Sequence, residues 1–320
     1  MPGATPPPGR ARRIPPRFSI VVPTCRRTQL LKRALASARI QTFQNFELLV
    51  VDDGAEEATR RLAAATAAQD ARIRYLPRAV RGGVAAARNT GIEQAVGRWV
   101  TFLDDDDELL PGMLERVAAC IDRAPEPIGF LWCGIRMVRD SAEGEELVLE
   151  RRWGDHVAAP RPRPSDRRRR ELDAIRIGCG FGLTVRRSLL EEIGGFDPSL
   201  PIAEETDLVL RLLSRGVRFT AIAEPLVTIH RVPGASLSNT TPPARRVESV
   251  QRLLARNREA LTRRPHLAAK LWESLGREHL RAGDARRAWH VALATLARHP
   301  LRWPSWRMLL RAAGSLRSNA

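Results

Sequence analysis

The sequence predicts an α/β fold in which a mostly parallel sheet is flanked by helices, followed by an all-helical C-terminal domain. Three observations support this prediction. Short apolar runs alternate with helical stretches from residue 18 onward. Each of the main apolar runs ends in polar residues, as the strands of ligand-binding α/β sheets do. Beyond Pro243 the composition changes to Arg, Ala, Leu and Trp without strand signals.

The first half of the chain contains the regular alternation. Strands are expected at 19–22, 46–51, 73–76 and 99–103, and helices at 28–40, 55–68 and 84–95. This alternation is typical of a parallel sheet. Ligands of such sheets bind outside the carboxyl ends of the strands. The polar segments 23–27, 52–54 and 104–107 are therefore expected to meet at one site.

The second half is less regular. A helix at 111–122 and a strand at 129–138 precede a charged, proline-rich stretch, 140–170, which we interpret as an insertion or loop. Its arginines 167–170 either meet an anionic substrate or form a solvated face. The elements expected next are an apolar segment at 178–185, helices at 188–193 and 204–215, a turn at 194–197, and short strands at 218–222 and 226–229.

Three regions are expected along the 320 residues. Residues 1–17, rich in Pro, Gly and Arg, form a disordered arm, residues 18–240 form the main domain, and residues 243–320 form a basic helical region. The arm has no apolar stretch of signal-peptide length, and no run of about 18 apolar residues occurs elsewhere. We therefore expect a cytoplasmic protein, with the inner face of the plasma membrane as its alternative location.

The chain is strongly basic. Its 53 basic and 36 acidic residues give a net charge of +17, which favours anionic partners. Nucleic acid is not expected, because no recognition motif accompanies the charge. Trp272, Trp289, Trp303 and Trp306 stand among arginines, so the C-terminal region either makes peripheral membrane contact or packs as a helical bundle. The four cysteines lack metal or disulfide spacing and are expected to be buried thiols.

The strongest chemical signal is an acidic run, Asp104 to Glu108, directly after an apolar strand. Such a cluster is expected to need a cation, and carboxylate oxygens suit Mg²⁺ or Mn²⁺ together with substrate phosphates. The alternative is an acidic loop that caps the following helix.

Two weaker signals accompany the acidic run. Asp52 and Asp53 end another strand, where a carboxylate can accept hydrogen bonds from a base or a ribose, although an ordinary turn is the alternative. Gly82 and Gly83 open a helix rich in small residues, which allows close backbone approach.

Taken together, these segments resemble family 2 glycosyltransferases, which have the A-type glycosyltransferase fold. The resemblance covers about residues 18–240 and is carried by a set of motifs in order. They are Val22-Pro23-Thr24, Val51-Asp52-Asp53-Gly54, Gly83 to Gly91, Phe102 to Asp107, Gly194-Gly195-Phe196-Asp197 and Glu204 to Leu208.

The resemblance implies a binding site for a nucleotide sugar. Pro23, Thr24 and Asp53 would line the nucleoside pocket, and Asp105 would lie near the sugar or ribose. Asp104 to Asp106 match the family's Asp-x-Asp motif, so the metal ligands would be Asp106 and Asp104. The further residues expected at the nucleotide sugar are Arg26, Gly83, Arg88, Asn89 and Asp104.

The resemblance also implies a catalytic base. In the family it is an acid of a Glu-Asp pair, which here falls on Glu204-Glu205, so Glu205 is the candidate, with Glu204 and Asp207 as alternatives. Glutamate replaces the usual aspartate at this place. A second departure is Val232, which stands before Pro233 where relatives often have histidine, with His230 two residues earlier. His230 is either a metal or diphosphate contact or a packed strand residue.

The implied reaction is inverting sugar transfer from a nucleotide-diphosphate sugar, with a UDP-sugar expected, to a hydroxyl or amine of a saccharide or lipid-linked acceptor. Bacterial polysaccharide or glycoconjugate synthesis is the expected setting. A nucleotidyltransferase is a rival, but the chain lacks a glycine-rich, lysine-bearing loop after its first strand. The other alternative is a degenerate transferase domain that docks on a membrane or a protein, against which the intact strand-end acids argue.

Overall fold

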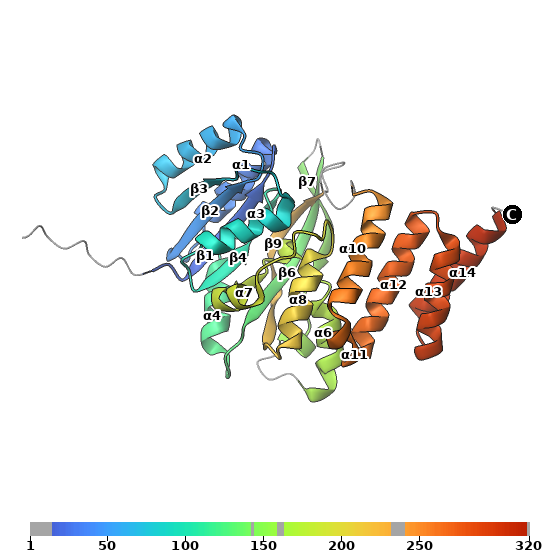
Figure 1. Cartoon of the computed structure of the whole chain (residues 1–320). Helices are drawn as coiled ribbons and strands as arrows, with labels where there is room; N and C mark the ends of the chain where they lie inside the picture. The colour runs from blue at the N-terminus through green and yellow to red at the C-terminus, as the bar shows by residue number, and fades with distance from the viewer. Residues whose placement is uncertain (1–14, 142–143, 159–162, 232–240, 319–320) are drawn as a thin grey trace, which may run out of the picture.

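The computed structural model describes residues 15–141, 144–158, 163–231 and 241–318 (Figure 1). The described strands form one mixed sheet in the order β3-β2-β1-β4-β8-β6-β9-β5, and β7 pairs with β6. The strands are β1 (Phe18–Thr24), β2 (Phe46–Asp52), β3 (Ile73–Pro77), β4 (Trp99–Phe102), β5 (Asp107–Leu109), β6 (Phe130–Ser141), β7 (Gly144–Arg151), β8 (Thr184–Arg186) and β9 (Phe219–Arg231). Strands β1 to β4 are parallel, as expected, whereas β8 and β5 join antiparallel.

Helices cover both faces of the sheet. In this part they are α1 (Thr28–Arg39), α2 (Glu57–Gln69), α3 (Gly83–Gln94), α4 (Met113–Arg123), α5 (Asp155–Ala158), α6 (Arg167–Ala174), α7 (Arg187–Ile193) and α8 (Glu204–Ser214). Side chains alternate along β1, so Val21 joins one hydrophobic core while Ile20 and Val22 join the other. Helix α3 lies so close to β1 that a Cβ on Gly91 would overlap Val21.

The described chain from Pro243 to Ser318 forms helices and short connections, as expected. The helices are α10 (Pro243–Arg256), α11 (Arg258–Thr262), α12 (Pro265–Arg281), α13 (Ala285–Arg298) and α14 (Trp303–Ser318), and α12 to α14 follow one another away from the sheet (Figure 1). Leu253, Leu261 and Leu267 belong to the same buried cluster as Val21 of β1. None of the helices described is long and apolar enough to cross a bilayer.

The structure corrects three expectations from the sequence. Of the two readings of the 140–170 stretch, its described part is an insertion with regular structure and not a loop, because β7 pairs along β6 through its main chain even though its side chains are exposed. The two expected strands at 218–229 are one bulged strand, β9, paired with β6. Arg17, which was assigned to the arm, forms an ion pair with Asp122 of α4, whereas residues 1–14 lie outside the described residues.

Candidate functional site

The acidic run follows β4 at the carboxyl ends of the parallel strands and continues into β5. Arg27, from the β1–α1 connection, bonds the Oδ1 atom of Asp105 at 2.7 Å and also pairs with Asp106. The hydroxyl of Thr24 donates to the Oδ2 atom of Asp105 at 2.7 Å. Burial raises the pKa of Asp105 to about 7, although Arg27 and Thr24 act in the opposite direction. The segments after β1 and β4 therefore meet, as the sequence predicts.

Arg88 of α3 connects the acidic run to α8. Its side chain is buried, and one terminal nitrogen bonds Asp104 at 2.8 Å. The other terminal nitrogen bonds Glu204 at 3.0 Å and Glu205 at 3.2 Å. Its guanidinium also lies over the ring of Phe196, 5.4 Å from the ring centre. One buried cation thus connects the expected diphosphate region with two of the three candidate bases, Glu204 and Glu205.

Glu204 and Glu205 begin α8, where carboxylates favour the helix dipole. The side chain of Glu204 is 8% exposed and that of Glu205 is 19% exposed. Burial raises the pKa of Glu204, and the negative charge of Glu205 raises it further. A Cβ on Gly178 would lie 3.7 Å from Glu205, so the backbone before β8 closely approaches this acid. Of the two glutamates, Glu205 is the more accessible.

Asp53 organises the glycine turn before α3. Its Oδ1 atom accepts from Arg78 and from the N–H of Gly82, both at 2.9 Å, and its Oδ2 atom accepts from the N–H of Gly83 at 2.8 Å. A carboxylate has about four acceptor sites, so Asp53 retains capacity for one more donor. The neighbouring Asp52 accepts from Gly54 and fulfils the ordinary turn role. Asp53 can therefore serve both the turn and a nucleoside.

Pro23, Arg26 and Gly83 lie around the same edge of the sheet. Pro23 is buried in β1, paired with Val51 of β2. Arg26 is exposed and has a φ of 57°, in the left-handed region. Gly83 has a φ of 83°, and a Cβ there would meet nothing within 4 Å. The turn at Gly83 thus leaves open space in front of its backbone.

Two expected site residues have structural partners. The amide of Asn89 donates to the carbonyl of Phe196 at 2.9 Å and accepts from its N–H at 2.8 Å, so it fixes the 194–197 turn, and its nucleotide contact stays a prediction. Asp207 is fully buried, and it bonds Arg211 at 2.7 Å and Asn257 at 2.8 Å. Because these partners surround it, Asp207 is removed as a candidate base.

Two groups of side chains offer metal ligands. Asp104 and Asp106 keep 30% and 21% of their side-chain surfaces exposed. In the part of the chain that the structure describes, Glu108, Glu145 and His230 also place one ligand atom each within 4.8 Å of one another. His230 is buried in β9, with its Nε2 atom 3.1 Å from Glu108. Val232 and Pro233 lie outside the described residues.

Sequence reasoning missed Arg27 and Arg78 as parts of this network. Arg26 and Arg27 are adjacent, and only the backbone turn decides which of them faces the acids. Arg78 directly follows β3, and this position after a strand end was the signal that could have indicated it as a site residue.

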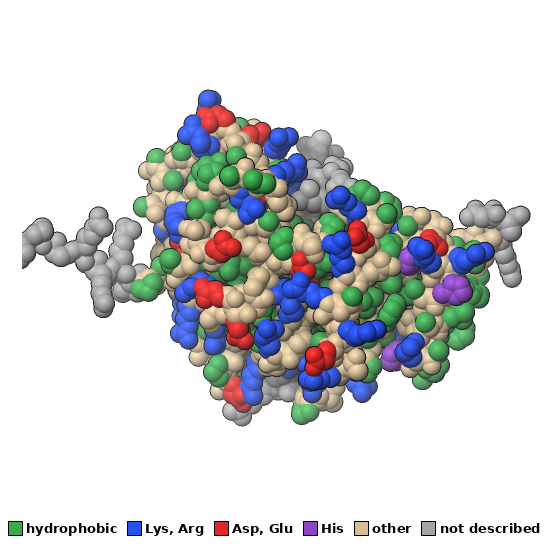
Figure 2. All heavy atoms as spheres, in the orientation of Figure 1, with side chains coloured by type: hydrophobic (Ala, Val, Ile, Leu, Met, Phe, Trp, Pro, Cys, Tyr) green, Lys and Arg blue, Asp and Glu red, His purple; other side chains and the backbone are tan. Residues whose placement is uncertain are grey.

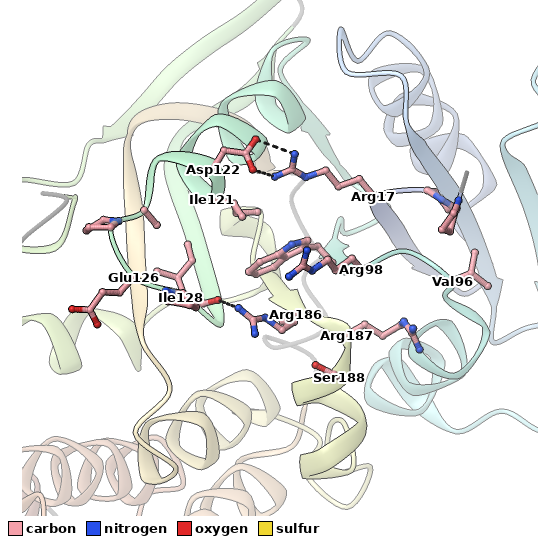
Figure 3. A pocket seen from close by; sticks show the side chains of 16 residues that line it. Arg17, Val96, Arg98, Ile121, Asp122, Glu126, Ile128, Arg186, Arg187 and Ser188 are labelled. Carbon is pink, nitrogen blue, oxygen red and sulfur yellow. Dashed lines mark hydrogen bonds and ion pairs between the residues drawn. The ribbon is translucent and has the colours of Figure 1, made fainter. Parts of the chain in front are cut away.

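The larger of two prominent cavities, about 930 Å³, lies elsewhere, at the amino ends of β1, β4 and β6 (Figure 3). Arg17, Trp99, Ile128 and Arg186 are among the residues that line it. It lies at the sheet edge opposite the acidic run and is therefore not the expected nucleotide site.

The fold and this acidic, arginine-bound edge define a transferase of the A-type glycosyltransferase fold. The model of glycosyl transferase family 2 matches residues 19–194, and the chain belongs to this family.

Relatives in sequence are bacterial glycosyltransferases. One is the GalNAc(5)-diNAcBac-PP-undecaprenol beta-1,3-glucosyltransferase of Campylobacter jejuni, 41% identical over 100 residues, which are 31% of this chain and 32% of that protein. The chain thus matches about a third of that relative's length. A glycosyltransferase of Haemophilus influenzae is 28% identical over 237 residues, 70% of this chain and 72% of that one. Relatives of this chain thus include an enzyme of bacterial glycoconjugate synthesis.

Solved structures share the fold. TarS of Staphylococcus aureus, in complex with UDP-GlcNAc, is 18% identical with a TM-score of 0.62, covering 92% of this chain and 79% of that chain. The mannosyltransferase PcManGT of Pyrobaculum calidifontis, in complex with GDP-Man and Mn²⁺, is 21% identical with a TM-score of 0.58, covering 95% and 86%.

Proposed function

We propose that this chain transfers a sugar, with inversion, from a nucleotide-diphosphate sugar to a hydroxyl or amine of a saccharide or lipid-linked acceptor. A UDP-sugar is the expected donor. The observation that carries the proposal is the position of Arg88, which bonds Asp104 on one side and Glu204 and Glu205 on the other. This contact sets the expected donor-binding acids beside the expected base, and the TarS and PcManGT complexes with nucleotide sugars support the donor class.

Glu205 is the proposed base. It takes the proton of the acceptor hydroxyl or amine. At the same time the acceptor oxygen or nitrogen forms a bond to the anomeric carbon, and the bond from the anomeric carbon to the diphosphate oxygen breaks. Glu204 is more buried, and with Arg88 it fixes the position of Glu205. Arg88 also places positive charge near the leaving diphosphate.

The acidic run fits a divalent cation. Asp104 and Asp106 are partly exposed carboxylates two residues apart in the run, and their hard oxygen atoms suit Mg²⁺ or Mn²⁺. When bound, such a cation offsets the charge that develops on the leaving diphosphate. Arg27 now pairs with Asp106, so it has to share or release this carboxylate for the cation.

The test measures turnover of a panel of nucleotide sugars through the release of the nucleoside diphosphate. The wild type is compared with Glu205→Gln and with the exposed control Glu192→Gln. Glu205→Gln is expected to lower kcat at least about 100-fold and to leave the donor KM nearly unchanged, because a base acts on the acceptor. Glu192→Gln is expected to behave as the wild type. Full activity of Glu205→Gln would show that the base is another residue.

A further inference from the structure

Helix α14 carries apolar side chains on two opposite faces. Met308 and Leu309 are buried and pack with Leu296 of α13. Successive residues of a helix turn by about 100°, so Trp303, Trp306 and Leu310 share the opposite face. Their exposed fractions are 65%, 44% and 64%. The last helix of the chain therefore presents an apolar face to solvent.

This apolar face lies in a wholly basic segment. From Ala285 to the C-terminus the chain has seven arginines and no acidic residue. Arg307 and Arg311, both exposed on α14, form no ion pair with any residue that the structure describes. Figure 2 shows hydrophobic side chains exposed among basic ones over the helices at the right-hand end of the molecule. The charge here favours an anionic partner.

A cavity of about 570 Å³ lies beside this face. It is lined by Arg277, Leu280, Arg281, Arg311, Gly314 and Ser315. Arg277 is half-buried in α12, and the two acids near it have other partners. Glu273 bonds Arg302, and Glu278 bonds Arg246 and Arg281. Desolvation lowers the pKa of Arg277, so an anion in this cavity would be stabilised.

We propose that α14 and the Arg277 cavity dock on a bilayer surface that contains anionic phospholipid. Trp303, Trp306 and Leu310 enter the headgroup region, where indole rings are favoured, and the cavity arginines bind lipid phosphates. The combination of an apolar face with arginines, of which Arg277, Arg307 and Arg311 form no ion pair in the described part of the chain, favours this occupant, because an anionic bilayer offers both complementary charge and an apolar layer below it. This docking surface is independent of the donor site.

The test is co-sedimentation of the full chain with phosphatidylcholine vesicles, with and without phosphatidylglycerol. Binding is expected only with phosphatidylglycerol and is expected to weaken with salt. The double variant Arg277→Gln with Arg281→Gln should lower the affinity for these vesicles about thirtyfold, because each arginine contributes about fivefold at an anionic surface. Trp303→Ser, Trp306→Ser and Leu310→Ser combined should lower it at least about tenfold. Circular dichroism checks that each variant is folded.

The matched controls change exposed residues of the catalytic domain. Ile40→Ser with Val96→Ser is the control for the apolar variant, and Arg98→Gln is the control for the arginine variant. They should bind vesicles as the wild type does. A wild type that ignores phosphatidylglycerol, or folded α14 variants that bind normally, would overturn the proposal. Sedimentation velocity adds one outcome against the proposal. If the wild type self-associates and does not bind vesicles, and the α14 variant no longer self-associates, the apolar face contacts a second copy of the chain. Nucleotide binding, measured separately, tests only the donor site.

Discussion

Individual arginines balance the acids of the candidate site. Arg88 bonds Asp104, and Arg27 bonds Asp105 and Asp106. The sequence indicated that the acidic run would need a cation, and in the structure guanidinium groups supply positive charge at each of these three aspartates. The acidic run can therefore be stable before a metal or a donor arrives.

The raised pKa of Asp105 gives a prediction for stability against pH. This pKa is about 7 in the folded chain against an ordinary 3.8, so the folded state binds the proton more tightly than the unfolded state. The stabilisation is fully present below about pH 4 and is lost as the pH rises through 7. Relative to Asp105→Asn, the unfolding free energy of the wild type should fall between about pH 4 and 7, by at most about 4 kcal/mol.

Urea unfolding in EDTA at several pH values measures this difference. Parallel pH profiles of the wild type and Asp105→Asn would contradict the pKa assignment.

The meeting of site segments was predictable from the sequence where it follows from strand ends. Asp105 bonds Thr24 because parallel strands end at one edge of the sheet. The bonds of Asn89 to Phe196 and of Asp207 to Asn257 were not predictable, because tertiary packing brings these partners together. No local pattern in the sequence encodes those contacts.

At the scale of elements, α3 and the 194–197 turn are held together by one side chain. Both ends of the Asn89 amide bond the backbone of Phe196. Gly195 has a φ of 64°, and a Cβ there would overlap Asn89. The element order was predictable from alternating periodicity, whereas β5 and β7 were not, since their pairing depends on main-chain bonds to β9 and β6.

Asn89→Ala is therefore expected to lower the unfolding free energy by about 2 kcal/mol, because two partly buried hydrogen bonds are lost. Gln94→Ala, at an exposed position of the same helix, should change it by less than about 0.5 kcal/mol. Chemical denaturation compares the two. Unchanged stability of Asn89→Ala together with weaker nucleotide binding would instead support Asn89 as a donor contact.

At the scale of the whole molecule, the catalytic part and the C-terminal helices share a core. Asn257, between α10 and α11, donates to the buried Asp207 of α8. Leu253 and Leu261 extend the main buried cluster. The composition change at Pro243 predicted where helices take over, but it could not show that the core continues, because burial depends on which helix faces meet.

Asn257→Ala should lower the unfolding free energy by about 1–3 kcal/mol, since it leaves a buried carboxylate without one of its donors. The variant should still unfold in one transition. Gln251→Ala, exposed on α10, is the control and should be neutral. Thermal unfolding with two transitions in the wild type would show that the C-terminal helices are an independent unit.

The most direct test of the candidate site is calorimetric titration of the folded chain with UDP, GDP, CDP and dTDP, each with and without Mn²⁺. We expect one nucleoside diphosphate to bind in a Mn²⁺-dependent manner, with binding lost in Asp106→Asn and kept in the control Asp122→Asn. Absence of binding to all four, or equal binding by Asp106→Asn, would contradict the assignment of the acidic run as the donor site.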